Sequence, residues 1–473
     1  MNKSIQQFNE FGIVNLENIF NNFVKDPSKI AEMVKSVTDE LVLLGLNMIS
    51  EEFDKYDQII RDMDSRKKDW YVVRQDDASI LTSLGMVKYH KTLFKNKETG
   101  KSEYLLDRVL NLGKHARMTE DAIVKLIDEA SITSYARSGN NISISNDTVT
   151  NQTVMNHLKA LDFPKYKESE KKKKIEYLYI DCDEDHVHLQ SKSKKGKNIV
   201  MPKLIYVYEG IDKSNENRPE LLNSRYFGGV YEGKKNDILW EEVAKYIEDT
   251  YDFDSIKQIY INGDGANWIK AGLEWINKSV FVLDKYHLSK YVVKLTSHLG
   301  SYTDIKKRKL YDALDKCNFD EVIEVYREIV SMTDDMHKSK VNEAYRYIIN
   351  NWDGILNQKL EGNPTCSAES HVSHVYSDRM SSRPLGWCKK GVDKMSRIEV
   401  YKANKGDLLE LVRYQKSEEK VVGLEDFTLS AAKVNSRENE LRRNLGVYYG
   451  MKTYSLPDNI RKAYAIKLHV FGI

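Results

Sequence analysis

Hydrophobic positions change their spacing several times along the chain, and each change predicts a different element. Residues 15–65 are typical of helix, because apolar residues such as Leu41, Leu44 and Met48 recur at roughly helical intervals among charged ones. Between residues 83 and 104, apolar and polar residues alternate on either side of a glycine-containing turn, which predicts a β-hairpin. The N-terminal region is therefore expected to be mainly helical with one hairpin.

From Thr119 the spacing becomes helical again. An acidic first turn follows Thr119, which favours a helix start there. Further along, Val154, Leu158 and Leu161 form one apolar stripe. Three short helices with a glycine-containing turn are typical of a helix-turn-helix DNA-binding domain, and a plain helical bundle is the alternative.

Beyond a polar linker at residues 164–174, strands and helices alternate. Three strand-like runs, IEYLYID, NIVMPKLIYVYEG and SRYFGGVYEG, predict an antiparallel meander. The runs that follow predict helix, strand, helix, strand and helix. The order βββαβαβα matches the ribonuclease H-like fold, a mixed sheet flanked by helices. Residues 295–360 then have a purely helical pattern.

These patterns predict an α/β protein whose ribonuclease H-like core carries an all-helical insertion, preceded by a mainly helical DNA-binding region with a β-hairpin. The predicted parts are an N-terminal helical region with the hairpin (1–112), a helix-turn-helix-like domain (113–165), the ribonuclease H-like domain (166–294 and 361–400), the helical insertion (295–360) and a C-terminal region (401–473).

Bulk composition changes this picture little. The chain has 473 residues, of which 41% are hydrophobic and 30% charged, and its net charge of +2 means that any basic surface is local. One basic cluster consists of Lys171, Lys172, Lys173 and Lys174, which are candidates to bind DNA. No C-x-x-C or H-E-x-x-H spacing occurs, which argues against zinc. No signal peptide or membrane-length apolar stretch is present, so we expect a cytoplasmic protein.

Three acidic residues stand at the edges of predicted elements. Asp183 and Asp264 lie at the ends of strand-like runs, and Glu369 lies in the first turn of a predicted helix. Neighbouring strands would bring the two aspartates together, and three carboxylates suit two Mg²⁺ or Mn²⁺ ions. Such a site activates water or a hydroxyl against a phosphodiester. Asp181 and Asp185 compete with Asp183, because strand alternation places all three on one face.

Other polar residues carry weaker signals. Asp284 and His287 are three residues apart at a strand-to-helix junction, and by spacing alone Asp284 caps the helix while His287 bonds locally. Arg379 and Arg383 follow Glu369 closely enough to reach DNA phosphates near the site. Solvated arginines are the alternative.

Four motifs together resemble a known family. YIDCDEDHVHLQ, YINGDGANWIK, FVLDKYHLSKYV and CSAESHVSHVYSDRMSSRPLGW are similar to those of the ISLre-type bacterial insertion-sequence transposases, which are related to Mutator-like transposases. The resemblance extends from about residue 70 to about residue 400. It departs from the family only at Asp185, where a small residue often follows the first catalytic aspartate.

The resemblance implies a DDE transposase. It places the catalytic, metal-binding residues on Asp183 (rather than Asp181), Asp264 and Glu369. The D-x-x-H signature of the wider group falls on Asp284 and His287 as active-site support, and residues 295–360 correspond to an insertion domain. It further implies two Mg²⁺ or Mn²⁺ ions per site, double-stranded DNA with terminal inverted repeats as partner, and a homo-oligomer on paired ends. Two rival functions stay open, a DNA-binding protein that no longer cuts and a nuclease without strand transfer.

Overall fold

A computed structural model of the chain describes residues 3–113, 115–166, 171–190, 198–212, 214, 220–363, 372–382 and 386–417. It is a mixed α/β protein with two compact units. The first comprises Met1–Ala122, Ser143–Asp147 and Gln415–Ile473, and the second comprises Ile123–Ile142 and Thr148–Tyr414. Across the described ranges, every helix is too short or too polar to cross a lipid bilayer.

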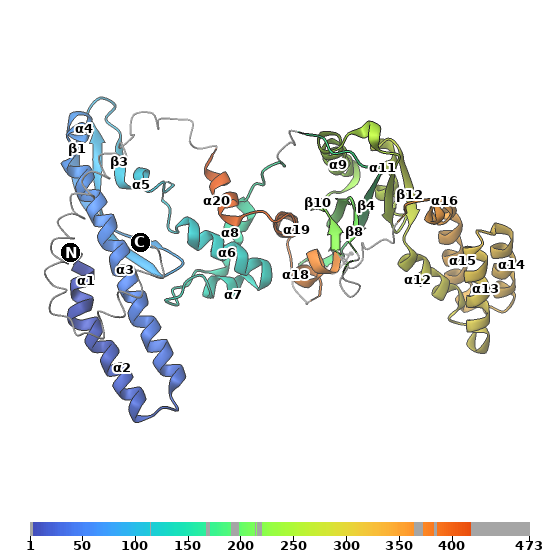
Figure 1. Cartoon of the computed structure of the whole chain (residues 1–473), viewed down its shortest axis with the longest axis horizontal. Coiled ribbons are helices and arrows are strands. Elements are labelled where there is room, and N and C mark those ends of the chain that lie inside the picture. The colour runs from blue at the N-terminus through green and yellow to red at the C-terminus, as the bar shows by residue number, and fades with distance from the viewer. Residues whose placement is uncertain are drawn as a thin grey trace. The chain divides into compact units, whose positions relative to one another are not determined.

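In the first unit, helices pack on a three-stranded antiparallel sheet of order β1-β2-β3 (Figure 1). The predicted hairpin is confirmed as β2 and β3, whereas β1 was not predicted. The elements are α1 (Lys3–Gln7), η1 (Phe8–Gly12), α2 (Ile13–Lys25), α3 (Ile30–Asp62), α4 (Asp64–Asp69), β1 (Trp70–Leu81), β2 (Met86–Asn96), β3 (Ser102–Tyr104) and α5 (Leu105–Val109).

Three short helices follow, as the pattern predicted: α6 (Glu120–Ile132), α7 (Tyr135–Asn140) and α8 (Asn151–Ala160). The predicted apolar stripe of α8 is confirmed, because Val154 and Leu158 are buried and Leu161 is buried directly after the helix.

The central sheet of the second unit has five strands in the order β10-β7-β4-β11-β12. β10, β7 and β4 are antiparallel neighbours, which confirms the predicted meander, and β4, β11 and β12 are parallel neighbours. The strands are β4 (Tyr177–Glu184), β7 (Lys203–Tyr208), β10 (Arg225–Gly229), β11 (Gln258–Gly263) and β12 (Ser279–Leu283). Two further pairs are β5 (Val187–His188) with β6 (Ile199–Val200), and β8 (Gly210–Asp212) with β9 (Glu220–Leu222).

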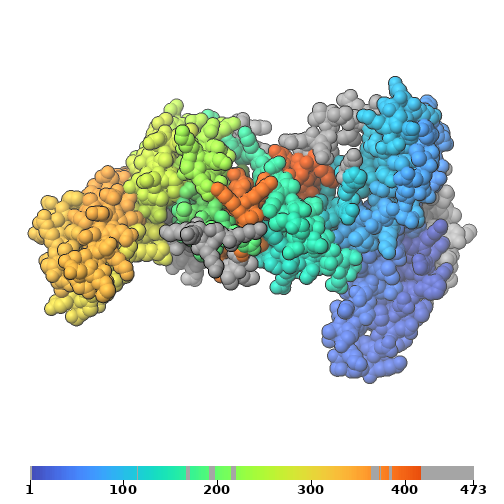
Figure 2. All heavy atoms as spheres, turned by 180° about the vertical axis from the view of Figure 1, so that it is seen from behind, coloured from blue at the N-terminus to red at the C-terminus, as the bar shows by residue number. Residues whose placement is uncertain are grey.

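Helices surround this sheet, and those from α12 to α16 form a block at its side, drawn yellow to orange in Figure 2. The helical pattern predicted for residues 295–360 is thereby confirmed. The helices are η2 (Gly233–Lys235), α9 (Asn236–Thr250), η3 (Phe253–Ser255), α10 (Asn267–Lys270), α11 (Gly272–Trp275), α12 (Lys285–Thr296), η4 (Gly300–Tyr302), α13 (Thr303–Asp315), α14 (Phe319–Ser331), α15 (Asp335–Asn350), α16 (Trp352–Leu356), η5 (Asn357–Lys359), η6 (Ser373–Ser377), α18 (Asp378–Met380), α19 (Lys389–Ala403) and α20 (Leu408–Ser417).

The two faces of the central sheet are both buried but differ in chemistry. Alternate residues of β4, such as Leu178 and Ile180, join an aliphatic core that includes Trp240 of α9. The residues between them belong to a layer of tyrosines, in which Tyr179 stacks on Tyr260 with ring centroids 5.8 Å apart. The tyrosine face therefore continues into the acidic positions at the ends of the strands.

Candidate functional site

Three aspartates lie at the same edge of the central sheet. In the parallel register Asn262 of β11 is opposite Asp181 of β4, which is the last pair. Asp183 and Asp264 each lie two residues further on, Asp264 just beyond the end of β11. The neighbouring strand β12 ends at Leu283, and the backbone N–H of Asp284 donates to the carbonyl of Gly263 at 2.9 Å. The expectation that the strands carrying Asp183 and Asp264 are neighbours is therefore confirmed, and Asp284 follows the next strand at the same edge.

The aspartates at this edge also affect the pKa values of two neighbouring groups. Burial opposes protonation of His287, but its hydrogen bond to Asp284 and the charges of Asp284, Asp183 and Asp264 outweigh burial and raise the pKa of the imidazole. Burial raises the pKa of the Cys182 thiol, and the charges of Asp181, Asp183 and Asp264 raise it further. The carboxylates thus act on one small region of the sheet.

The structure separates Asp181 from Asp183, which the alternation pattern did not. Asp181 is fully buried and accepts hydrogen bonds from the hydroxyls of Tyr206 at 2.9 Å and Tyr208 at 3.2 Å, and from the amide of Asn262 at 2.7 Å. Asp183 lies two residues nearer the strand end and is 8% exposed. Buried donors therefore engage both oxygens of Asp181, whereas Asp183 stands nearer the exposed end of the strand.

Asp185, the other alternative to Asp183, lies just after the end of β4. Its Oδ1 accepts hydrogen bonds from the backbone N–H of His186 at 2.8 Å and the hydroxyl of Ser381 at 2.9 Å. Its buried Oδ2 has no hydrogen-bond partner. Asp185 therefore connects the end of β4 to the residue that follows α18.

The turn after β11 holds Asp264 in place. Its Oδ1 accepts the backbone N–H of Ala266 at 2.9 Å, and its carbonyl accepts the hydroxyl of Tyr347 from α15 at 2.6 Å. Gly265 has φ +85°, and a Cβ there would lie 2.3 Å from the side-chain oxygen of Asn351. Glycine is therefore required at this position by both the backbone conformation and the space.

Asp284 begins α12 in the way that its spacing predicted. Its Oδ1 accepts the backbone N–H of Tyr286 at 2.9 Å as an N-cap, and its Oδ2 lies 2.9 Å from Nδ1 of His287. Because Asp284 accepts at Oδ2, the imidazole Nδ1 carries the hydrogen of this bond. The local interpretation is confirmed, and the same pair also stands at the acidic edge of the sheet.

The third predicted ligand, Glu369, and the predicted DNA contact Arg383 lie outside the described residues. The flanks of this segment are described. The carbonyl of Gly362 accepts the hydroxyl of Tyr179 at 2.6 Å, and the hydroxyl of Tyr376 donates to the carbonyl of Lys203 at 3.0 Å. Within the described ranges, no group of three or more acidic, histidine or cysteine side chains is spaced to hold a metal ion by itself.

The prediction that Arg379 contacts DNA is wrong for this structure. Arg379 is 8% exposed, its Nε donates to the carbonyl of Ala130 at 2.8 Å, and its guanidinium lies 4.7 Å from the ring centroid of Trp387. Ala130 is in the last turn of α6, where carbonyls lack partners within the helix. Arg379 therefore satisfies a helix end instead of facing solvent.

The four residues of the lysine cluster are all exposed, as a role in DNA binding would require. They are Lys171, Lys172, Lys173 and Lys174. One member already has a carboxylate partner, because Nζ of Lys173 lies 2.7 Å from Glu209.

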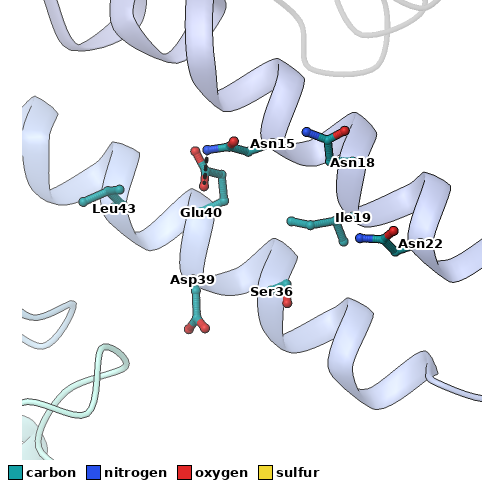
Figure 3. Close-up of a pocket in the computed structure, with 8 residues that line it drawn as sticks. All are labelled: Asn15, Asn18, Ile19, Asn22, Ser36, Asp39, Glu40 and Leu43. Atoms are coloured by element: carbon teal, nitrogen blue, oxygen red, sulfur yellow. Dashed lines mark hydrogen bonds between the residues drawn. The ribbon is translucent and has the colours of Figure 1, made fainter.

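Figure 3 shows a hollow elsewhere, between α2 and α3, lined largely by amide, hydroxyl and carboxylate groups. Its polar lining includes Asn15, whose side-chain amide donates to Glu40 at 3.3 Å. It belongs to the first unit, whereas the aspartates belong to the second.

Sequence reasoning missed the residues that support the aspartates from behind. Tyr206 and Tyr208 stood in a run recognised only as a strand, and Asn262 stood two residues before Asp264. Their alternation with aliphatic residues was the available signal, because polar groups at every second position of a buried strand must find partners.

Comparisons with known proteins place the chain among uncharacterised relatives. The family model described as "Uncharacterised protein family (UPF0236)" matches residues 23–418. A UPF0236 protein of Caldanaerobacter subterraneus subsp. tengcongensis is 38% identical over 396 residues, covering 83% of this chain and 82% of the relative. Two others from the same organism are 37% and 36% identical over 395 residues, with 83% of this chain covered and 83% and 82% of the relatives. The name of the first carries eleven locus designations, and that of the third carries four.

Proposed function

We propose that this chain, which belongs to the uncharacterised protein family UPF0236, is a metal-dependent DDE transposase of an ISLre-type bacterial insertion sequence. It would bind terminal inverted repeats, cleave DNA at the ends of the element and join the freed 3′-hydroxyl to target DNA. The observation that carries this proposal is the alignment of Asp183, Asp264 and Asp284 at one edge of three adjacent parallel strands.

The sheet order supports a ribonuclease H-like core. Three antiparallel strands followed by two parallel ones, in the order β10-β7-β4-β11-β12, agree with the βββαβαβα arrangement of that fold. Its catalytic acids stand on the first and fourth strands, which correspond here to β4 and β11. Asp183 and Asp264 occupy those two strand ends. The helices from α13 to α16 then correspond to the insertion that precedes the catalytic glutamate.

The donor chemistry of the site suits Mg²⁺ or Mn²⁺. Asp183 and Asp264 offer carboxylate oxygens, the ligands that such hard cations prefer, and we propose Glu369 as the third. The described flanks of its segment support this, since Gly362 and Tyr376 both contact strands of the central sheet. Two bound ions would lower the pKa of an attacking water or 3′-hydroxyl and stabilise the leaving oxygen.

The chain's own residues prepare the site. The turn at Gly265 and the hydroxyl of Tyr347 fix the backbone of Asp264, so that its carboxylate needs little reorganisation. His287 is held by Asp284, and without bound cations the surrounding carboxylates raise the pKa of its imidazole. When protonated, the ring can attract a phosphate oxygen of the DNA strand.

Two further observations favour DNA as the partner. The cluster from Lys171 to Lys174 is exposed, and α6, α7 and α8 supply the three short helices expected of a terminal-repeat reader. One relative carries eleven locus designations in its name. We expect such multiple copies of a coding region that moves within a genome. We therefore propose action on chromosomal DNA in the nucleoid.

An end-cleavage assay tests the proposal. DNA duplexes that carry the sequences flanking the coding region are incubated with the protein and Mg²⁺ or Mn²⁺. We expect cleavage by the wild type and none by Asp183→Asn, Asp264→Asn or Glu369→Gln. Asp254→Asn is the matched control, because it removes the same charge from an exposed residue that precedes β11. Full cleavage by Asp264→Asn would refute the assignment.

The two rival functions give different results in the same assay. A DNA-binding protein that no longer cuts would retain binding to these ends and cleave with neither ion. A nuclease without strand transfer would cleave but would produce no joined product from pre-cleaved ends. The alignment of the aspartates argues against the first rival, and only joined product separates the second from a transposase.

A further inference from the structure

The helical hairpin formed by α2 and α3 has an apolar face that the described residues of the first unit leave exposed. α2 is strongly amphipathic, yet none of its residues is buried. The hairpin turns at Asp26 and Pro27, and α3 then runs back along α2. Most helices gain their stability by burying one face, so an amphipathic helix without buried residues is incompletely packed.

One surface of the hairpin is polar. Figure 3 shows it as a hollow lined mainly by polar residues, such as Asn15, Asn18 and Asn22 of α2 and Ser36 and Asp39 of α3, with Ile19 and Leu43 as its apolar members. Polar side chains from both helices therefore dominate this surface.

The opposite surface is apolar on both helices. At 100° per residue, the exposed apolar positions lie about half a turn away from the polar ones on each helix. The two sets therefore share the surface opposite the hollow. They are Ile13 (43% exposed), Phe20 (48%) and Val24 (74%) of α2, and Ile30 (59%), Val34 (54%) and Leu41 (50%) of α3.

The apolar positions of α3 also have the spacing of a helix-helix seam. Ile30, Val34, Val37, Leu41 and Leu44 follow one another at intervals of four, three, four and three residues. This alternation keeps apolar side chains on one side of a helix that packs lengthwise against another. Val37 and Leu44 are already half-buried, so Ile30, Val34 and Leu41 are the members of this seam that remain exposed to a helical partner.

We infer that this face binds the same face of a second copy of the chain, forming a four-helix interface. The six exposed side chains are each about half exposed, which corresponds to roughly 500 Å² of apolar surface on each copy at about 150 Å² for a fully exposed side chain. Two copies would bury on the order of 1,000 Å², which is about the area that a biological protein interface should clear. The surface is therefore large enough for a dimer.

Charge disfavours the other classes of partner. Between residues 13 and 48 the hairpin has five acidic residues and three basic ones, which gives 3 − 5 = −2. An acidic hairpin repels nucleic acid and anionic lipid headgroups, because both require clustered lysine or arginine. A second apolar face of the same kind remains the partner of matching chemistry. This inference concerns the first unit and does not depend on the proposed catalytic activity.

The mass of the full-length chain in solution, measured by light scattering after size-exclusion chromatography without DNA, tests the inference. We expect twice the chain mass for the wild type and a single chain mass for Phe20→Glu with Val34→Glu. The matched control is Asn18→Glu with Ser36→Glu, which adds the same charges to exposed positions of the same two helices but in the polar hollow. The control should remain dimeric.

Circular dichroism on all variants keeps the test interpretable, since every substituted position is exposed and the fold should persist. A monomeric wild type would overturn the inference, and it is the result expected if residues 418–473 of the same chain cover the face. A dimer that survives Phe20→Glu with Val34→Glu would overturn it too, because the copies would then meet elsewhere.

Discussion

Substitutions at Asp181 and Asp183 should have opposite consequences, although the two residues share one strand face. Replacing Asp181 by alanine removes the acceptor for the hydroxyls of Tyr206 and Tyr208 and the amide of Asn262. All of these lie in a fully buried site, so water cannot replace the lost acceptor. We therefore expect Asp181→Ala to fail through folding rather than through chemistry.

The magnitude follows from the contacts. A buried polar group left without a partner costs about 1–3 kcal/mol, and three donors lose this acceptor, so the cost is a fraction of three such penalties. Part of this cost is offset because a buried carboxylate is itself desolvated. A net loss of about 3 kcal/mol would lower the melting temperature by roughly 6–12 °C in a unit of this size. Asp181→Asn keeps one acceptor oxygen, so we expect a smaller loss and retained cleavage.

Asp183→Asn should leave stability nearly unchanged and abolish cleavage. The amide oxygen can still accept the backbone N–H of Glu184, which now bonds Oδ1 at 2.8 Å. Removing one negative charge opposite Asp264 relieves repulsion between like charges. Thermal melts and end-cleavage rates on the same preparations separate the two effects. If Asp181→Asn folds normally but cannot cleave while Asp183→Asn cleaves at the wild-type rate, the assignment is reversed.

Other predictions concern the supports of the site. The pKa of His287 is raised above its unfolded value of 6.5. Its contribution to the free energy of unfolding is therefore fully present below about pH 6.5 and is lost as pH rises through the folded pKa. His287→Gln should flatten this pH dependence in urea melts from pH 6 to 9. Gly265→Ala should cost about 2–3 kcal/mol in urea unfolding, because of its φ of +85° and the 2.3 Å approach to Asn351, and wild-type stability would contradict this. Arg379→Met should lower the free energy of unfolding by about 2 kcal/mol, because it removes the hydrogen bond to Ala130 and the cation–π contact with Trp387. The salt dependence of DNA binding should stay unchanged. A shallower dependence of binding on salt would show that Arg379 contacts phosphate after all.

Sequence patterns predicted those elements in which buried residues recur at the spacing of a helix or strand. They did not predict features whose burial depends on residues far away in the chain. The strands that carry Asp183 and Asp264 were recognised because aliphatic and aromatic residues fill them. β1 was missed because most of its twelve residues, from Trp70 to Leu81, are exposed, so no alternation marks it. Arg379 was predicted to contact DNA because nothing nearby in the sequence reveals the helix end at Ala130, some 249 residues earlier.

The two faces of the central sheet explain why the exposure of its aspartates increases from Asp181 to Asp264. One face is aliphatic, and an aspartate placed there would be buried without donors. The other face carries tyrosines, whose hydroxyls make a buried acid such as Asp181 tolerable. Along the same face exposure rises from zero at Asp181 to 8% at Asp183, and Asp264 beyond the end of β11 is half-buried. The tyrosine layer therefore fixes the strands, and the more accessible carboxylates, which we propose as the cation ligands, stand at the strand ends.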